Sequence, residues 1–242
     1  MSGLFSLDSW STVWTHRESF LLGLGNTLQT AVCALALAFI IGAALGLMST
    51  SGSKLLRIIA RIYVEFVQNT PLLLQLCFLY YALAFAGVSL GVIRTGIIAL
   101  GVYTGAYMGE VVRAAIESVP KGQFEAGYAQ GFNTVEVLLY IVLPQAYRNI
   151  VPTLLSQVIT TIKDSSYLAN VATIELMARI RQLLSAAGTY NGLGTVNVSD
   201  VMVLFGTACV IYFIINFTLS CVVRAMQNRR RKALVFAPAK AA

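Results

Sequence analysis

The stretch LLGLGNTLQTAVCALALAFIIGAALGLM, residues 21–48, carries no charged side chain, and its neighbours extend this charge-free region from Ser19 to Ser53. It is rich in Leu, Ala and Gly. An α-helix crosses the hydrocarbon core of a bilayer with about 20 consecutive, predominantly apolar residues. We therefore predict a membrane-spanning helix over roughly 22–48.

The composition of the whole chain excludes an ordinary soluble domain. Hydrophobic residues make up 57% of the 242 residues, charged residues only 11%, and the mean hydropathy is +0.76. Soluble domains carry about 25% charged residues. A very apolar globular core is the alternative, but the apolar residues come in long uninterrupted runs, which is the pattern of a membrane protein.

Four further apolar runs predict four further spans, over roughly 64–86, 95–115, 149–170 and 201–223. Polar residues gather in a loop at 117–148 and again in a helix and loop at 175–200. In the second segment, Glu175, Arg179 and Arg181 are expected on a solvated outer face. The predicted fold class is an all-α membrane protein with five transmembrane helices in a single domain, residues 1–242.

The placement of Lys and Arg predicts the orientation, because cytoplasmic loops are enriched in both residues. With the N-terminus outside, the cytoplasmic side receives Lys54, Arg57, Arg61, Arg113, Lys121, Arg148, Arg224, Arg229, Arg230, Arg231, Lys232 and Lys240. The outside then receives only Arg17, Arg94, Arg179 and Arg181. We therefore predict an N-out, C-in topology, and we interpret the net charge of +7 as a topology signal, not as a nucleic-acid-binding surface.

The polar loop 117–148 has the local signals of two short helices. Residues 123–130 form the first, and Gly131 suits the left-handed position that ends a helix. Asn133, with Glu136 three residues later, is a capping-box start for the second. Pro144 is expected to bend or stop that second helix. The loop is thus predicted to be a rigid helical protrusion on the cytoplasmic face.

The same loop resembles the EAA loop of bacterial ABC importer permeases, EAA-x3-G-x9-I-x-L-P. The sequence here is EAGYAQG at 125–131, then nine residues, then IVLP at 141–144, with Gly127 in place of the second Ala. The resemblance implies a type I ABC importer permease core, and a protrusion that sits in a groove of the ATPase subunit. The coupling residues that it implies are Glu125, Ala126, Gly127, Gly131, Ile141, Leu143 and Pro144.

Further segments resemble the polar amino-acid permeases of this group, the histidine, glutamine and glutamate permease-like family. GNTL at 25–28 is similar to their G-x-T-L opening, and NTPLLLQ at 69–75 to their R-G-T-P-L-L-x-Q segment, with Gln68-Asn69 in place of Arg-Gly. Residues 107–123 match the end of their third helix and the entry to the loop. KDSSYL at 163–168 is similar to their K-D-T/S-S-L segment.

Polar side chains within the predicted spans are candidates for binding substrate. Lys163 lies about 21 Å along the fourth span, where a charge is costly and needs a partner or a wet cavity. Lys163 and Asp164 are adjacent and point to different sides of a helix, so the carboxylate and ammonium of a zwitterionic amino acid are possible partners. The remaining candidates are Ser165, Ser166, Gln68 and Thr70. The alternative is an ion-pair network between helices, without contact to substrate.

The chain lacks the G-x4-G-K-S/T motif that cradles ATP phosphates, so we expect no cofactor on it and no enzymatic activity of its own. The resemblance implies two cytoplasmic ABC ATPase subunits that use ATP and Mg²⁺, a second permease copy or homologue, an extracytoplasmic solute-binding protein and a polar amino-acid substrate. It also implies the bacterial inner or plasma membrane. A stand-alone secondary transporter of polar amino acids and a membrane scaffold or channel are the alternatives. The sequence leaves open which amino acid is carried and whether the permeases form a homodimer or a heterodimer.

Overall fold

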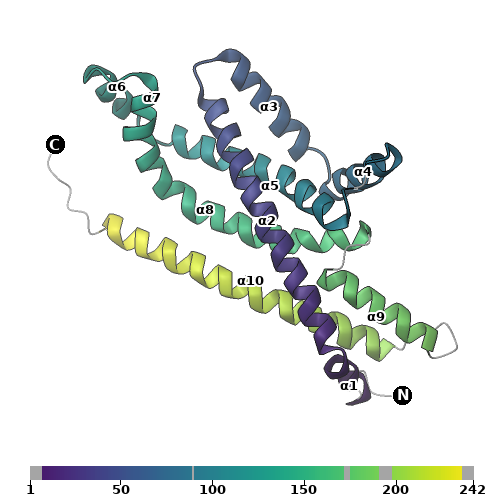
Figure 1. Ribbon diagram of the computed structural model, residues 1–242. Coiled ribbons are helices and arrows are strands. Elements are labelled where there is room, and N and C mark those ends of the chain that lie inside the picture. The colour runs from purple at the N-terminus through teal and green to yellow at the C-terminus, as the bar shows by residue number, and fades with distance from the viewer. Residues whose placement is uncertain (1–6, 89, 172–174, 191–197, 236–242) are drawn as a thin grey trace. The chain divides into compact units, whose positions relative to one another are not determined.

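The computed structural model describes residues 7–88, 90–171, 175–190 and 198–235, and every regular element within them is helical (Figure 1). The helices are α1 (Leu7–Thr15), α2 (Arg17–Thr50), α3 (Lys54–Gln68), α4 (Leu72–Phe85), α5 (Val92–Glu117), α6 (Lys121–Ala129), α7 (Thr134–Glu136), the π-helix η1 (Val137–Val142), α8 (Leu143–Asp164), the 3₁₀-helix η2 (Ser165–Val171), α9 (Leu176–Tyr190) and α10 (Val198–Val235). Residues 191–197 of the predicted outer segment lie outside the described residues.

The chain forms two compact units, and each is described by itself. The first comprises residues 1–34, 72–100 and 161–217, and the second comprises residues 35–71, 101–160 and 218–242.

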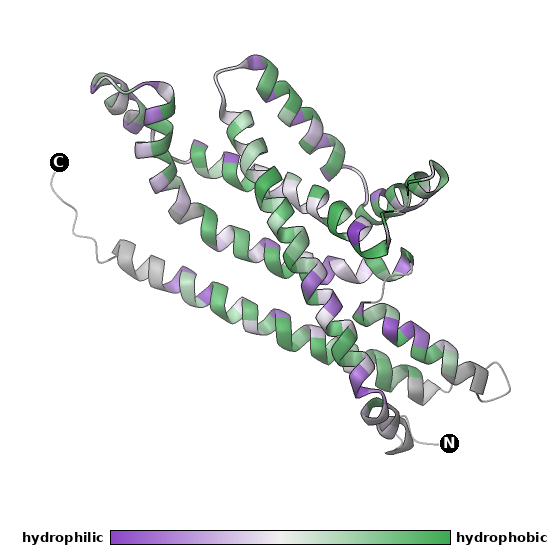
Figure 2. Cartoon of the chain, viewed as in Figure 1, coloured by the Kyte–Doolittle hydropathy of each residue, from purple (hydrophilic) through white to green (hydrophobic). Residues whose placement is uncertain are grey.

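Three of the described helices are long and apolar enough to cross a membrane: α2, α5 and residues 201–228 of α10. α3 and α4 add a fourth if they form one broken span. Hydrophobic residues dominate α4 and α10 in Figure 2. Along α10, Val210, Phe213 and Ile214 are exposed, as expected of side chains that face lipid. The predicted all-α membrane fold is confirmed, while the five-span count and the N-out orientation stay predictions.

The second predicted span, 64–86, is not one helix. α3 ends at Gln68 and α4 begins at Leu72. Pro71 has no backbone N–H and disfavours helical geometry at Thr70, so the helix stops before it. At this end of α3 the Glu65 carbonyl accepts from both the backbone N–H of Asn69, at 3.1 Å, and the Asn69 side chain, at 2.7 Å.

The fourth predicted span, 149–170, is also not a single α-helix. α8 starts earlier, at Leu143, and ends at Asp164, where η2 takes over. The Ser165 hydroxyl donates to the carbonyl of Ile162 at 2.8 Å, a local side-chain bond of the kind that competes with the α-helical ladder.

Close packing of α2 against α5 builds the second unit. A Cβ atom on Gly46 would lie 2.5 Å from Cβ of Val112, and one on Gly105 would lie 2.8 Å from Cγ2 of Ile41. The same close approach involves Gly42, Gly101 and Gly109. Small residues four apart let membrane helices approach backbone to backbone, because van der Waals packing drives their association.

The first unit has its own apolar core, formed by Phe20, Leu176, Ile180, Leu204 and Ala208. These residues come from α2, α9 and α10. A Cβ atom on Gly23 would lie 2.9 Å from Cα of Leu176, so α9 lies directly against α2 at its first residue.

Candidate functional site

The first helix of the polar loop 117–148, α6, ends as the sequence predicted. Gly131 has φ +85°, in the left-handed region that a Cβ atom disfavours. Its N–H donates to the carbonyl of Tyr128 at 3.0 Å, and the N–H of Phe132 donates to that of Gly127 at 3.2 Å. These two bonds satisfy carbonyls at the end of α6 and reverse the chain.

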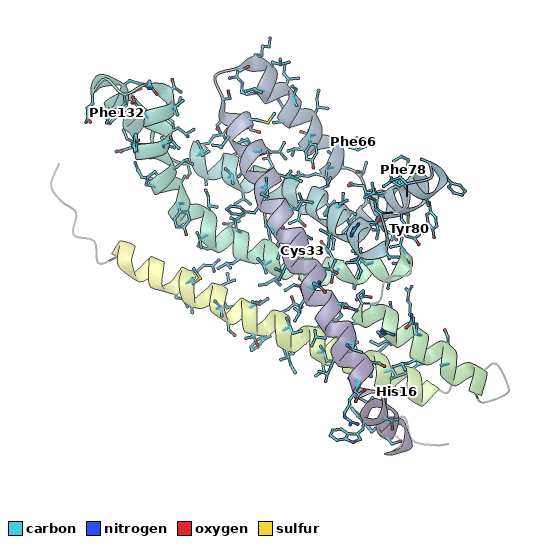
Figure 3. All side chains as sticks on the ribbon, in the orientation of Figure 1. His16, Cys33, Phe66, Phe78, Tyr80 and Phe132 are labelled. Atoms are coloured by element: carbon cyan, nitrogen blue, oxygen red, sulfur yellow. The ribbon has the colours of Figure 1, made fainter. Side chains whose placement is uncertain are left out.

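The predicted capping box at the start of α7 is also confirmed. The Asn133 side chain accepts from the N–H groups of Val135 and Glu136, each at 3.0 Å. The Glu136 carboxylate in return accepts from the N–H of Asn133 at 2.8 Å. The turn between α6 and α7 is therefore fixed by hydrogen bonds on both sides, and Figure 3 labels Phe132 within it.

Gly127 explains how the two arms of the loop pack together. It is buried, and a Cβ atom there would lie 2.7 Å from Cδ1 of Ile141 and 2.8 Å from Cγ2 of Val137. A further bond joins the arms, from Nε2 of Gln145 to Oε1 of Gln123 at 3.1 Å. Gly127 stands where the EAA pattern has its second Ala, and its contacts with Ile141 and Val137 leave little room for the methyl group of an alanine.

Pro144 does not stop the second helix, which was one of the two outcomes that the sequence predicted. The chain stays helical from Thr134 to Asp164, with the π-helix η1 over Val137–Val142 just before the proline. Proline has no N–H to continue the ladder, and its ring collides with the preceding turn of a regular α-helix. We interpret the wider π turn as the feature that accommodates it.

We call the hairpin formed by residues 121–144 the coupling hairpin. Of the residues with an implied coupling role, Glu125, Ala126, Gly131 and Pro144 are exposed, Ile141 and Leu143 are half-buried and Gly127 is buried. The exposed apolar side chains of the same hairpin are Tyr128, Phe132, Val135, Leu139 and Tyr140. This surface combines a carboxylate with several apolar groups, which suits docking to another protein.

The candidate substrate residues 163–166 lie in the first unit, where α8 gives way to η2. Lys163 is exposed, Asp164 and Ser166 are half-buried and Ser165 is fully buried. Neither Lys163 nor Asp164 forms an ion pair among the described residues. Their roles as ligands stay a prediction.

Gln68 and Thr70 belong to the second unit, so the six candidates are not described as one site. Nε2 of Gln68 donates to the carbonyl of Ala106 at 3.5 Å. The Thr70 hydroxyl donates to the carbonyl of Phe66 at 2.9 Å, within its own turn.

A polar cleft of about 550 Å³ opens between α3 and α5 in the second unit, and Gln68 is among the residues that line it. The charged residues that line it are Lys54, Arg57, Arg61 and Glu65 on α3, and Glu110, Arg113 and Glu117 on α5. Arg113 forms ion pairs with Glu110 at 2.7 Å and with Glu117 at 2.6 Å. The α3 wall therefore has an excess of basic side chains, and on the α5 wall both carboxylates are paired with Arg113.

Residues 38–232 match the family described as binding-protein-dependent transport system inner membrane component. The chain belongs to this family. Curated permeases align with it over nearly their whole length, so it is a permease subunit of an ABC amino-acid importer, as the loop resemblance predicted.

Three relatives illustrate how far this permease resembles known ones. The probable glutamine permease GlnM of Bacillus subtilis (strain 168) is 34% identical over 223 residues, 92% of this chain and 98% of the relative. The L-cystine permease TcyB of the same organism is 33% identical over 217 residues, 88% of each chain. The glutamine permease GlnP of Escherichia coli (strain K12) is 30% identical over 224 residues, 92% of this chain and 97% of the relative.

Solved structures agree with this assignment. The crystal structure of an amino acid ABC transporter with histidines superposes with a TM-score of 0.79 at 28% identity, over 93% of this permease and all of that chain. An inward-facing MetNI methionine ABC transporter shares the fold, with a TM-score of 0.65 at 22% identity over 88% of this permease and 98% of that chain.

Sequence analysis missed one polar centre of the permease. Glu175 was expected on a solvated face, but it is fully buried, with 0% of its surface exposed. Thr27 and Tyr212, which hydrogen-bond to it, lie far from it along the chain. The apolar residues that follow it, Leu176 and Met177, were the one local signal of burial.

Proposed function

We propose that this permease forms the membrane path for polar amino acids in an ATP-driven importer of the bacterial plasma membrane, and that the coupling hairpin transmits closure of a separate ATPase. The observation that carries the proposal is the hairpin itself. It carries the EAA signature, its turn is fixed by a capping box and a left-handed glycine, and Glu125 is exposed on it. A stand-alone secondary transporter has no use for such a protrusion.

The assembly in this proposal holds two permeases, which are two copies or a pair of homologues, and two cytoplasmic ATPase subunits that bind ATP and Mg²⁺. An extracytoplasmic solute-binding protein delivers the amino acid. The N-terminus lies outside and the coupling hairpin inside, as the Lys and Arg distribution favours.

Charges of both signs support a zwitterionic substrate. Lys163 and Asp164 are without an ion pair in the described part of the first unit, so both remain available to an amino acid. In the second unit, the α3–α5 cleft also holds charges of both signs: three cationic side chains and Glu65 on α3, and Arg113 paired with two carboxylates on α5. A polar cleft with such walls lowers the free-energy cost of moving a charged molecule across a bilayer.

Uptake by the purified complex tests the proposal. The permease is purified with its co-expressed ATPase, reconstituted in proteoliposomes with the solute-binding protein, and given labelled glutamine, glutamate, histidine, cystine and, as an apolar comparison, leucine. We expect ATP-dependent uptake of at least one polar amino acid in preference to leucine. Uptake that follows an ion gradient and ignores ATP would contradict the proposal.

A further inference from the structure

α3 carries three exposed cations along one face. Lys54, Arg57 and Arg61 are three and four residues apart, so they form one stripe on the helix, and all three line the α3–α5 cleft. Among the described residues, Lys54 and Arg61 have neither an ion pair nor a hydrogen bond. Arg57 donates to the backbone carbonyls of Ser51 and Gly52, at 2.7 and 3.4 Å. We call these three cations the basic stripe.

The carboxylates of the cleft do not neutralise the basic stripe. On α5, both carboxylates that line the cleft are paired with Arg113. On α3, Glu65 follows Arg61 by four residues, but its Oε2 accepts from the Asn69 side chain at 3.1 Å, and it forms no ion pair in the described part of the chain. The α3 wall thus has three cationic side chains against one carboxylate. A ligand with net negative charge matches this wall better than a zwitterion does.

The start of α3 adds to the attraction for an anion. Ser53, at the N-cap position, makes no side-chain capping hydrogen bond. The first N–H groups of a helix have no acceptor within the helix, and the positive end of the helix dipole lies there. An anion beside Lys54 and Arg57 is therefore attracted by the backbone as well as by the two side chains.

A second stripe on α3 is apolar and exposed. Its members are Leu55, Ile59, Ile62 and Phe66, the last of which is labelled in Figure 3. The first member directly follows Lys54 and the third directly follows Arg61, so the two stripes lie about 100° apart around the helix. Hydrophilic and hydrophobic residues accordingly both mark α3 in Figure 2. The apolar stripe covers about 16 Å of helix, close to the roughly 15 Å of hydrocarbon in one leaflet.

We propose that α3 binds one anionic phospholipid, with the lipid phosphate on the basic stripe and the acyl chains along the apolar stripe. The predicted orientation puts the start of α3 at the cytoplasmic surface, where clustered Lys and Arg attract anionic lipid. A free phosphate ion would match the cations but leave the apolar stripe uncovered. A zwitterionic lipid would cover the apolar stripe but bring no net charge to the cations. The α5 wall of the cleft is not part of the proposed site.

Photocrosslinking in nanodiscs tests the proposal on the assembled complex. The permease with its co-expressed ATPase is reconstituted with phosphatidylglycerol or phosphatidylcholine that carries a photoreactive acyl chain, and labelled peptides are identified by mass spectrometry. We expect phosphatidylglycerol to label residues 55–66 at least about fivefold more than phosphatidylcholine. Equal labelling by the two lipids would overturn the proposal. Absence of labelling by both would also overturn it, because protein, such as a second permease, would then cover the stripe.

Substitution of the two cations without a partner tests the basic stripe. Lys54→Gln with Arg61→Gln strands no polar group, so the melting temperature of the complex should stay near wild type, while labelling by phosphatidylglycerol should fall severalfold. Lys54→Arg with Arg61→Lys keeps both charges and should keep the preference. Arg224→Gln is the matched control, since Arg224 is an exposed cation on α10, predicted on the same side of the membrane. An unchanged preference in the double Gln variant would contradict the proposal.

Two measurements on the wild type do not depend on any variant. Added NaCl should weaken the preference for phosphatidylglycerol, because salt screens exposed charges, and a preference that ignores salt would contradict the proposal. An excess of inorganic phosphate or of glutamine, at matched ionic strength, should leave the labelling unchanged. Loss of labelling with phosphate would assign the cations to a free phosphate ion, and loss with glutamine would assign them to the amino acid. Either result would overturn the lipid site.

The lipid site and the proposed function can fail separately. Every reading of the lipid site is a labelling yield, so its failure leaves ATP-driven uptake as proposed. Absence of ATP-dependent uptake by the wild type would overturn the proposed function, and selective labelling of residues 55–66 would still support the lipid site.

Discussion

A Cβ atom on Gly127 would lie 2.8 Å from Cγ2 of Val137, closer than carbon atoms pack in folded proteins. Gly127 lies on α6 and Val137 begins η1, so the two arms of the coupling hairpin meet at the backbone of the glycine. Val137 belongs to a buried cluster with Ala115 and Ile116 near the end of α5. The geometry of the hairpin is thereby tied to a membrane helix of the same unit.

Gly127→Val should separate the two arms of the hairpin. Overpacking of this kind costs about 1–3 kcal/mol, and the branched Val137 has little freedom to move away. We expect a lower melting temperature and less ATPase recovered with the permease. Gly122→Val is the control on the same helix, since a Cβ atom there has no neighbour within 4 Å. Equal melting temperatures and equal ATPase recovery for the two variants would show that the contact of Gly127 with Val137 does not stabilise the hairpin.

Gly105→Val should disrupt the packing of α2 against α5, because its side chain would meet Cγ2 and Cβ of Ile41. We expect a loss of about 1–3 kcal/mol, seen as earlier thermal unfolding in detergent and a lower yield of monodisperse protein. Gly206→Val on α10, where a Cβ atom has open space, should have little effect. Wild-type stability of Gly105→Val would contradict the close helix approach.

Asp164→Asn and Lys163→Met separate substrate contact from structural pairing. Because neither residue forms an ion pair among the described residues, we expect both variants to assemble with near wild-type stability and to lose or retune uptake. A structural ion pair predicts instead a loss of about 3–5 kcal/mol, since one charge would be stranded. Thermal stability and stimulated ATP hydrolysis, measured on the same purified variant, decide between them. Wild-type transport in both variants would exclude a substrate role.

The predicted topology is tested by labelling from each side of the membrane. In a variant without native cysteines, Ser199→Cys should react with an impermeant maleimide in intact cells, because the start of α10 is predicted outside. A reporter fused after Lys232 should read cytoplasmic. Reaction of Ser199→Cys only after permeabilisation would contradict the N-out arrangement.

The features of the site that the sequence predicted correctly are those formed by residues close together in the chain. The capping box joins Asn133 to Glu136 within one turn, and the left-handed position of Gly131 follows from the end of α6 beside it. Such patterns need no knowledge of distant residues. The family resemblance then supplied the function, because its spaced residues lie in this same loop.

The parts that were missed depend on partners far apart in the chain or on competing signals. Thr27 and Glu175 are separated by 148 residues, and no local pattern joins them. At Pro71 the long apolar run suggested one continuous helix, although proline was the visible reason for a break. The glycines four apart at 101, 105 and 109 are a pattern that predicts close packing against another membrane helix. The sequence analysis used this stretch only to place a membrane span.

Amino-acid-stimulated ATP hydrolysis by the reconstituted complex tests the central claim most directly. The double variant Glu125→Lys with Gly131→Val reverses an exposed charge on the coupling hairpin and forces a branched side chain into a left-handed backbone, which costs about 1–2 kcal/mol. The account predicts that the variant permease inserts in the membrane normally, while bound ATPase and its stimulated rate fall to the background of ATPase without permease. Wild-type assembly and stimulation in the double variant would contradict the assignment of this hairpin as the coupling element.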